Sequence, residues 1–173
     1  MSYNWELPFA RLFGPRRITT GWHLTGITRF ADGTPVSLQG GGDYALTNVG
    51  LDYPNQVASI HKMNPRSSGN LYFSPTSFAS GLSCGYEVCG VTGSSPQYSF
   101  SGPGTINTDA GLEKDTKITE RVALNLRLEM FNVFKHANFL SSGVIGNPSS
   151  GQFGQATTVA PGRIGQISGK IIF

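Results

Sequence analysis

The sequence predicts an all-β fold, an antiparallel meander of about five strands with two long loops. Only 13% of the residues are charged, against roughly 25% in ordinary soluble domains. The 23 glycines and 10 prolines disfavour long helices and favour strands joined by turns. The third observation is a period of two along Val122 to Met130, where every second residue is apolar.

The first two predicted strands precede the long glycine-rich region. Tyr3 to Phe9 is a short strand with a proline near its end, followed by a connection to residue 20. Trp22 to Phe30 alternates and begins a strand over 22–38. Asp32 to Pro35 is a turn or bulge signal within it, and Val36 to Leu38 is expected to continue the strand.

The third and fourth predicted strands, 106–118 and 121–134, form a hairpin around the tight connection Thr119 to Arg121. Leucine, methionine and glutamate are good helix formers, but a helix over 122–130 would have apolar groups all round. As a strand it has one wholly apolar face. The polar residues that alternate along the hairpin are Asn107, Asp109, Glu113, Asn125, Arg127 and Glu129.

The last predicted strand, 162–173, has Ile167, Gly169, Ile171 and Phe173 on one face. The stretches 40–104 and 135–161 are rich in Gly, Ser, Asn and Pro and are expected to be long loops. Such loops are unusual in compact soluble domains but typical of the extracellular side of outer-membrane barrels.

An unbroken apolar face beside a face with ionisable groups suits a wall between lipid and water, since a charge at the bilayer midplane costs ~2–4 kcal/mol. Aromatic residues at the strand ends suit the membrane interface. Five strands cannot close a barrel, because the smallest bacterial barrels have about eight. We therefore expect an incomplete, C-terminal part of a transmembrane β-barrel, in which Met1 is internal to a longer protein and the signal peptide is absent.

Two groups of residues carry a family resemblance. The first runs from Gly102-Pro-Gly104 through Ile118-Thr-Glu-Arg121 to Phe131-Asn132 and Asn138-Phe139, and continues with Arg163-Ile-Gly-Gln166 and Ile171-Ile-Phe173. The second is Glu6 to Phe9 with Gly21 to Phe30 and Gly33 to Pro35. Together they resemble the C-terminal barrel of Oar-like TonB-dependent receptors over nearly the whole chain.

This resemblance implies a barrel of about 22 strands with an N-terminal plug; we expect this chain to supply only part of the barrel and none of the plug. It implies a transporter in the outer membrane of a Gram-negative bacterium, taking up an unidentified small solute. The expected partners are outer-membrane lipid, the remaining strands and the plug, and TonB only through the missing N-terminal part. The polar hairpin residues are then lumen-facing candidates, and Ile171 with Phe173 a C-terminal assembly signal.

Candidate chemistry is sparse. Cys84 and Cys89 lack further cysteine or histidine ligands at zinc spacing, which leaves a small-loop disulfide or two free thiols, and the Gly/Ser-rich loop favours the disulfide. The three histidines are scattered, no nucleophile or phosphate-loop motif is present, and basic residues do not cluster as in nucleic-acid binders. We expect no enzyme activity, cofactor or metal.

Two alternatives stay open. A soluble extracellular all-β module that binds a carbohydrate or protein would also show alternating strands. The aromatic residues of the long loop would either line a solute mouth or pack the loop on itself: Tyr44, Tyr53, Tyr72, Phe73, Tyr86 and Tyr98.

Overall fold

The structure is a computed structural model, and it describes residues 1–9, 15–43, 45–48, 50–79, 90 and 92–173. The chain divides into two compact units. We call the first the sheet unit; it comprises Met1–Phe30, Ile106–His136 and Pro161–Phe173. The second, the loop unit, comprises Ala31–Thr105 and Ala137–Ala160.

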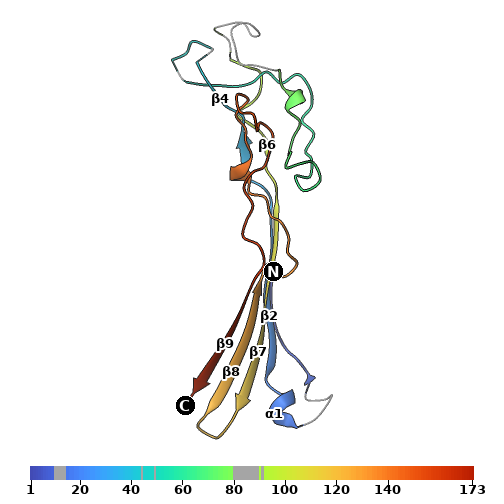
Figure 1. The fold of residues 1–173 in the computed structure, drawn as a ribbon, viewed down its shortest axis with the longest axis vertical. Helices are drawn as coiled ribbons and strands as arrows, with labels where there is room; N and C mark the ends of the chain where they lie inside the picture. Colours follow the sequence, from blue (N-terminus) through green and yellow to red (C-terminus); the bar gives the residue numbers. More distant parts are fainter. Residues whose placement is uncertain (10–14, 44, 49, 80–89, 91) are drawn as a thin grey trace. The chain divides into compact units, whose positions relative to one another are not determined.

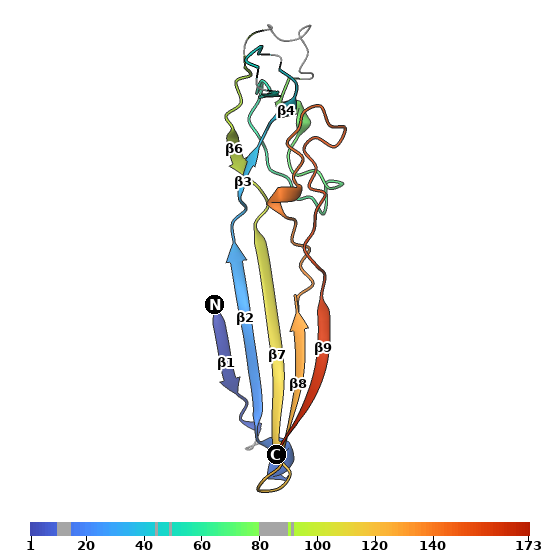
Figure 2. The same cartoon turned by 90° about the vertical axis from the view of Figure 1, so that its left-hand side faces the viewer.

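The sheet unit is built on a five-stranded sheet of order β1-β2-β7-β8-β9. Its strands are β1 (Ser2–Glu6), β2 (Trp22–Ala31), β7 (Thr105–Lys117), β8 (Ala123–Phe131) and β9 (Ile164–Ile172). Neighbouring strands run antiparallel, as the alternating arrows in Figure 2 show. The predicted all-β antiparallel meander is therefore confirmed.

The register of the sheet gathers polar side chains on one face and apolar side chains on the other. Glu113 lies opposite Arg127, which lies opposite Ser168, so three polar positions adjoin across β7, β8 and β9. One residue along, Leu128 lies opposite Ile167. Directly opposite residues of an antiparallel pair have their side chains on the same face of the sheet. The period of two in the sequence therefore gives the sheet one polar face and one apolar face.

The apolar face is not covered by a second sheet. In β8, Leu126 and Leu128 are 46% and 40% exposed, and in β9 Ile167 is 82% exposed. A soluble sandwich would bury these side chains against an opposing layer. The leucines of Val122 to Met130 thus lie on a strand, as predicted, and remain open to the surroundings.

The chain passes from β1 to β2 and from β7 to β8 at the same end of the sheet, and the β7–β8 connection is a short turn (Figure 1 and Figure 2). In the β7–β8 turn, the hydroxyl of Thr119 accepts hydrogen bonds from the amides of Arg121 and Val122. Between β1 and β2 lies one turn of helix, α1 (Arg16–Thr19), which begins after Pro15. A helix of four residues has too little periodicity to be found in the sequence.

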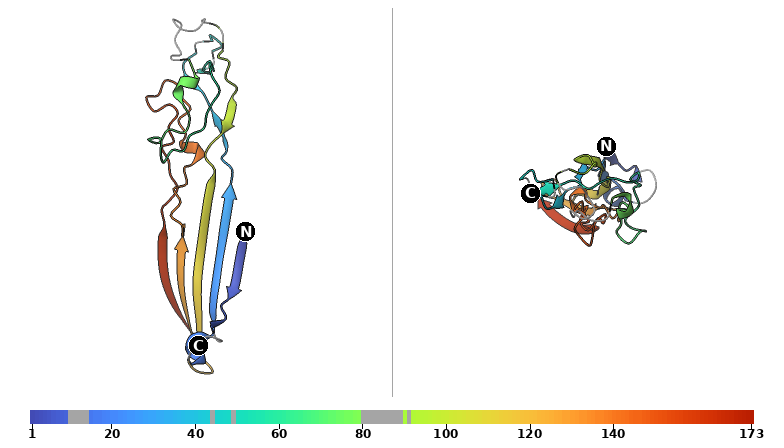
Figure 3. Two further views of the ribbon diagram at one scale, coloured as in Figure 1. Left: turned by 90° about the vertical axis from the view of Figure 1, so that its right-hand side faces the viewer. Right: turned by 90° about the horizontal axis from the view of Figure 1, so that it is seen from above.

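The outer strands β1 and β9 each have one hydrogen-bonded neighbour among the described strands (Figure 3, left). All nine residues of β9 are exposed. Open edges of this kind leave backbone N–H and C=O groups without partners, which a lipid environment does not tolerate.

The loop unit has its own hydrophobic core. Two small sheets occur in it, one pairing β3 (Pro35–Ser37) with β6 (Tyr98–Ser101), the other pairing β4 (Gly40–Gly41) with β5 (Leu51–Asp52). Two 3-10 turns, η2 (Pro75–Ser77) and η3 (Ser141–Gly143), complete it. The buried apolar residues come from both predicted loops and from the chain before them: Val36, Leu38, Tyr72, Phe73, Phe78, Phe139, Val144 and Ala156.

Three features of the structure differ most from the sequence prediction. The first strand ends at Glu6 rather than residue 9, before Pro8. The predicted strand 22–38 ends at Ala31, and Val36 belongs to another sheet, where it pairs with Phe100; the break between the two strands contains Gly33. A Cβ there would lie 2.0 Å from the carbonyl oxygen of Gly102, so the two backbones approach more closely than a side chain permits. The stretch 40–104 is not structureless but contains β4, β5, β6 and η2.

Within the described residues, no helix combines the length and the hydropathy needed to span a lipid bilayer.

Candidate functional site

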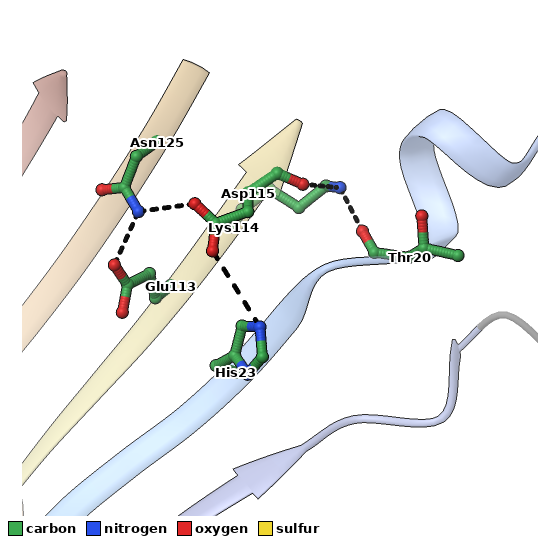
Figure 4. A network of polar contacts seen from close by, with 6 residues as sticks. All are labelled: Thr20, His23, Glu113, Lys114, Asp115 and Asn125. Carbon is green, nitrogen blue, oxygen red and sulfur yellow. Dashed lines mark hydrogen bonds and ion pairs between the residues drawn. The ribbon is translucent and has the colours of Figure 1, made fainter. Parts of the chain in front are cut away.

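The candidate site is the polar face of the sheet unit, and its centre is Asn125 on β8. The side-chain amide of Asn125 donates to Glu113 Oε1 at 2.6 Å and to Asp115 Oδ1 at 2.8 Å (Figure 4). Across β7, the other oxygen of Asp115 lies 4.0 Å from His23 Nε2 on β2. One neutral amide thus holds two carboxylates of β7 in place on a wall that is partly open to water.

A second group on the same face joins β8 to β9. Arg127 Nη2 forms an ion pair with Glu129 Oε1 at 2.8 Å. The other carboxylate oxygen of Glu129 accepts a hydrogen bond from the Gln166 side chain. The ion pair lies within β8 rather than across the hairpin, so the described ion pairs do not form a ladder between β7 and β8.

A third group closes the far end of the hairpin. Asp109 Oδ1 accepts hydrogen bonds from the Asn107 side chain at 2.8 Å and from the Asn132 amide at 2.9 Å. Asn132 has a positive φ of 52°, which asparagine tolerates better than most residues. Its side chain then bonds both the amide and the carbonyl of His136, which fixes the chain as it leaves β8.

The structure therefore brings all six polar hairpin candidates to one face: Asn107, Asp109, Glu113, Asn125, Arg127 and Glu129. The register adds residues on β1, β2 and β9 to this face, among them Asn4, Thr25 and Lys170. That this face lines a water-filled lumen remains a proposal. Ile171 lies on the opposite, apolar face with Leu124, and Phe173 ends the chain fully exposed.

One residue that the sequence did not single out is Lys114, on the apolar face of β7. It is only 8% exposed. Its ammonium donates to the carbonyls of Arg17 and Asp115, both at 3.1 Å, and to that of Thr20, and it lies 5.6 Å from the centre of the Trp22 ring. The sequence signal that could have identified Lys114 is a single lysine within an alternating apolar run, near the end of the strand.

The Lys114 ammonium has three protons, and three carbonyl acceptors surround it. Two of them, Arg17 and Thr20, lie at the C-terminal end of α1, where a positive charge is favourable. This contact fastens α1 against the apolar face of the sheet. It explains how a charge is accommodated on a face that is otherwise apolar.

The aromatic residues of the long loop differ in burial: some pack the loop on itself, and one described tyrosine is exposed. Tyr72 and Phe73 are buried, and the Phe73 ring contacts Phe78, Phe100 and Phe153 with centroids 5.0 to 5.8 Å apart. Burial raises the pKa of the Tyr72 hydroxyl above 10.0. Tyr98, in contrast, is 62% exposed. Tyr44 and Tyr86 lie outside the described residues.

Cys84 and Cys89 also lie outside the described residues, so the predicted disulfide stays a prediction. Among the residues that the structure describes, no three His, Asp or Glu side chains are grouped so as to hold a metal ion.

An antiparallel sheet with an uncovered apolar face and a hydrogen-bonded polar face is the arrangement found in the wall of a membrane β-barrel. The comparison with protein families agrees: residues 1–166 match the model of the outer membrane beta barrel domain, and the chain belongs to this family. Neither the search of curated proteins nor that of solved structures gave a match.

Family membership places the chain in the cell outer membrane. An outer-membrane barrel domain is incompatible with the alternative of a soluble extracellular all-β module. Barrel domains of this kind are typically non-enzymatic.

Proposed function

We propose that the chain is the C-terminal part of the barrel of a TonB-dependent receptor, which takes up a small solute across the outer membrane. The observation that carries the proposal is the two-faced sheet with an open edge at both β1 and β9. A wall of this kind separates lipid from water only when further strands close it, so the functional unit is a larger barrel. The sequence resemblance to Oar-like receptors supplies the kind of barrel.

In this proposal, the polar face from β1 to β9 lines the lumen beside a plug supplied by the N-terminal part of the receptor. The hydrogen-bonded carboxylates and amides hold the wall rigid while leaving a wettable surface for the solute and the plug. TonB acts only on the N-terminal part. The short β7–β8 turn faces the periplasm, and the two long connections, about 40–104 and 135–161, face the cell exterior.

The test of orientation is cysteine labelling in intact cells. Single cysteines replace Thr119 in the β7–β8 turn and Val57, which is 64% exposed in the loop unit. A membrane-impermeant maleimide should label Val57→Cys on whole cells and Thr119→Cys only after the outer membrane is permeabilised. Labelling of both on whole cells would contradict the proposed topology.

The test of transport compares three strains: the parent, one lacking this receptor and one lacking TonB. Each is grown on the same solute mixture, and the depleted solutes are measured by mass spectrometry. We expect at least one solute that the parent removes and that neither deletion strain removes. If the receptor deletion changes depletion but the TonB deletion does not, the barrel is a TonB-independent pore.

A further inference from the structure

Two adjoining grooves lie at the turn end of the sheet unit, where α1 packs on the sheet. The first, the apolar groove, has a volume of about 510 Å³ and is lined chiefly by Ile18, Trp22, Leu112, Leu126, Leu128 and Ile167. The second, the basic groove, is larger, about 960 Å³, and includes Arg16, Arg17 and Lys117. Arg17 and Thr116 line both grooves, so the two grooves are adjacent.

We propose that these grooves bind one anionic glycerophospholipid, with an acyl chain in the apolar groove and the phosphate at Arg16 and Arg17. The apolar groove lies over β7 and β8 in the middle of the sheet, so strands added at β1 or β9 would not cover it. It opens on the face that meets the hydrocarbon in a barrel. An acyl chain is therefore the ligand that its lining fits.

The charges of the basic groove select the head group. Arg16 and Arg17 are exposed, and among the described residues no carboxylate forms an ion pair with either guanidinium. Two carboxylates also line this groove, Asp115 and Glu120. Asp115 accepts a hydrogen bond from Asn125 on the polar face. Guanidinium groups bind phosphate through paired N–H donors, so the two arginines are the natural phosphate ligands.

Lys114 contributes charge but no hydrogen bond to this site. Its ammonium lies at the wall of the apolar groove, yet its three protons are taken up by the carbonyls of Arg17, Thr20 and Asp115. It therefore orients α1, so that Ile18 reaches the apolar groove and Arg17 the boundary between the two. The indole N–H of Trp22 donates to the Ile18 carbonyl at 2.8 Å and fixes the same turn.

The location of the lipid follows from the proposed orientation, on which this inference rests in part. If the β7–β8 turn faces the periplasm, the site lies in the inner leaflet of the outer membrane. An anionic glycerophospholipid, represented by phosphatidylglycerol, is then the occupant.

The experiment is native mass spectrometry of the purified full-length protein in detergent, titrated with phosphatidylglycerol or with phosphatidylethanolamine of the same acyl chains. We expect tighter binding of phosphatidylglycerol. Replacing both arginines, Arg16→Gln with Arg17→Gln, should weaken that binding roughly 30-fold, at about 1 kcal/mol for each cation near an anionic lipid, and should remove the preference.

Two further variants locate the site. The matched control, Lys62→Gln with Arg66→Gln, removes two exposed cations of the loop unit and should leave lipid binding unchanged. Ile18→Gln, at a residue that is 65% exposed on α1 and outside the strands, should weaken both lipids alike. Heat-modifiable migration in gels checks that each variant is folded.

Three results would overturn the inference: equal affinity for the two lipids, unchanged binding in the double arginine variant, or a dimer of the protein in place of lipid adducts. Lipid binding to the purified protein does not depend on TonB. Normal phosphatidylglycerol binding without TonB-dependent uptake would therefore overturn the transport proposal alone.

Discussion

Asn125 and Glu113 lie on neighbouring strands, and the side-chain amide of one donates to the carboxylate of the other at 2.6 Å. They are not directly opposite in the register, where Glu113 faces Arg127 and Asn125 faces Asp115. The amide thus spans two rungs of the hairpin. It separates two like charges that would otherwise be adjacent on β7.

The first prediction concerns this amide. Asn125→Asp replaces a donor by a third carboxylate, and the loss of two charge-assisted hydrogen bonds should lower the free energy of unfolding by about 1–3 kcal/mol. The measurement is denaturant unfolding of the full-length barrel in detergent. Asn125→Ser removes the same donor without adding charge and should lose less. Equal losses in the two variants would show that repulsion between the carboxylates is unimportant.

The second prediction tests which face meets lipid. Leu128→Arg places a charge on the apolar face and should destabilise the barrel in lipid vesicles by ~2–4 kcal/mol, whereas Ser168→Arg, opposite Arg127 on the polar face, should be tolerated. The amount of folded barrel in the outer membrane gives the same comparison in cells. Equal tolerance of both arginines would reject the assignment of the faces.

The third prediction concerns a glycine in the loop unit. Gly154 has φ = 87°, and a Cβ there would lie 2.6 Å from the carbonyl oxygen of Phe73. Gly154→Ala should destabilise the loop unit by at least about 1–2 kcal/mol, since alanine disfavours this backbone conformation. The rate at which a protease cuts the loops on intact cells reports the change. Gly151→Ala, where a Cβ meets nothing within 4 Å, is the control and should be cut at the parent rate.

The fourth prediction concerns Tyr72, whose pKa is raised above 10.0 by burial. Above about pH 10 the unfolded chain loses this proton first, so the folded state binds more protons and its stability falls as the pH rises. In the ultraviolet titration of tyrosinate, Tyr72→Phe should remove a late-ionising component.

The same substitution also removes the hydrogen bond that the Tyr72 hydroxyl donates to the Ser101 carbonyl at 2.9 Å. We expect a loss of about 1 kcal/mol in the stability of the loop unit at neutral pH. If Tyr72→Phe leaves the late-ionising component of the tyrosinate titration unchanged, the Tyr72 hydroxyl is not buried in solution.

The sheet unit was predictable because its information is local. Along Val122 to Met130 the period of two specifies both the strand and its faces, and Thr119 to Arg121 specifies the turn. The contacts of Asn125 were not predictable in detail. Alternation places it on the polar face, but only the register shows that it reaches Glu113 and Asp115 and that Arg127 pairs with Glu129 instead.

The loop unit was not predictable for the opposite reason. Phe73 is buried by rings from positions 78, 100 and 153, of which the last two are distant in the chain, and the three follow no period. Isolated bridges, such as Leu71 with Gln155 and Val144 with Ala156, hold its extended segments. Val36 was wrongly assigned to the preceding strand because the sequence around Gly33 does not reveal the close approach of Gly102. Lys114 was missed because two of its three acceptors, the carbonyls of Arg17 and Thr20, lie at the end of a helix too short to predict.

The shared core of the two long connections also bears on how this surface can evolve. Phe73 and Phe78 from one connection pack on Phe153 from the other, so neither can be exchanged, lengthened or transplanted alone without exposing the rings of its counterpart. Diversification under attack by phages or antibodies should then concentrate at tips that contribute nothing to the core, such as Leu46, which is 72% exposed. Chimeric receptors should remain intact only when both connections come from the same parent.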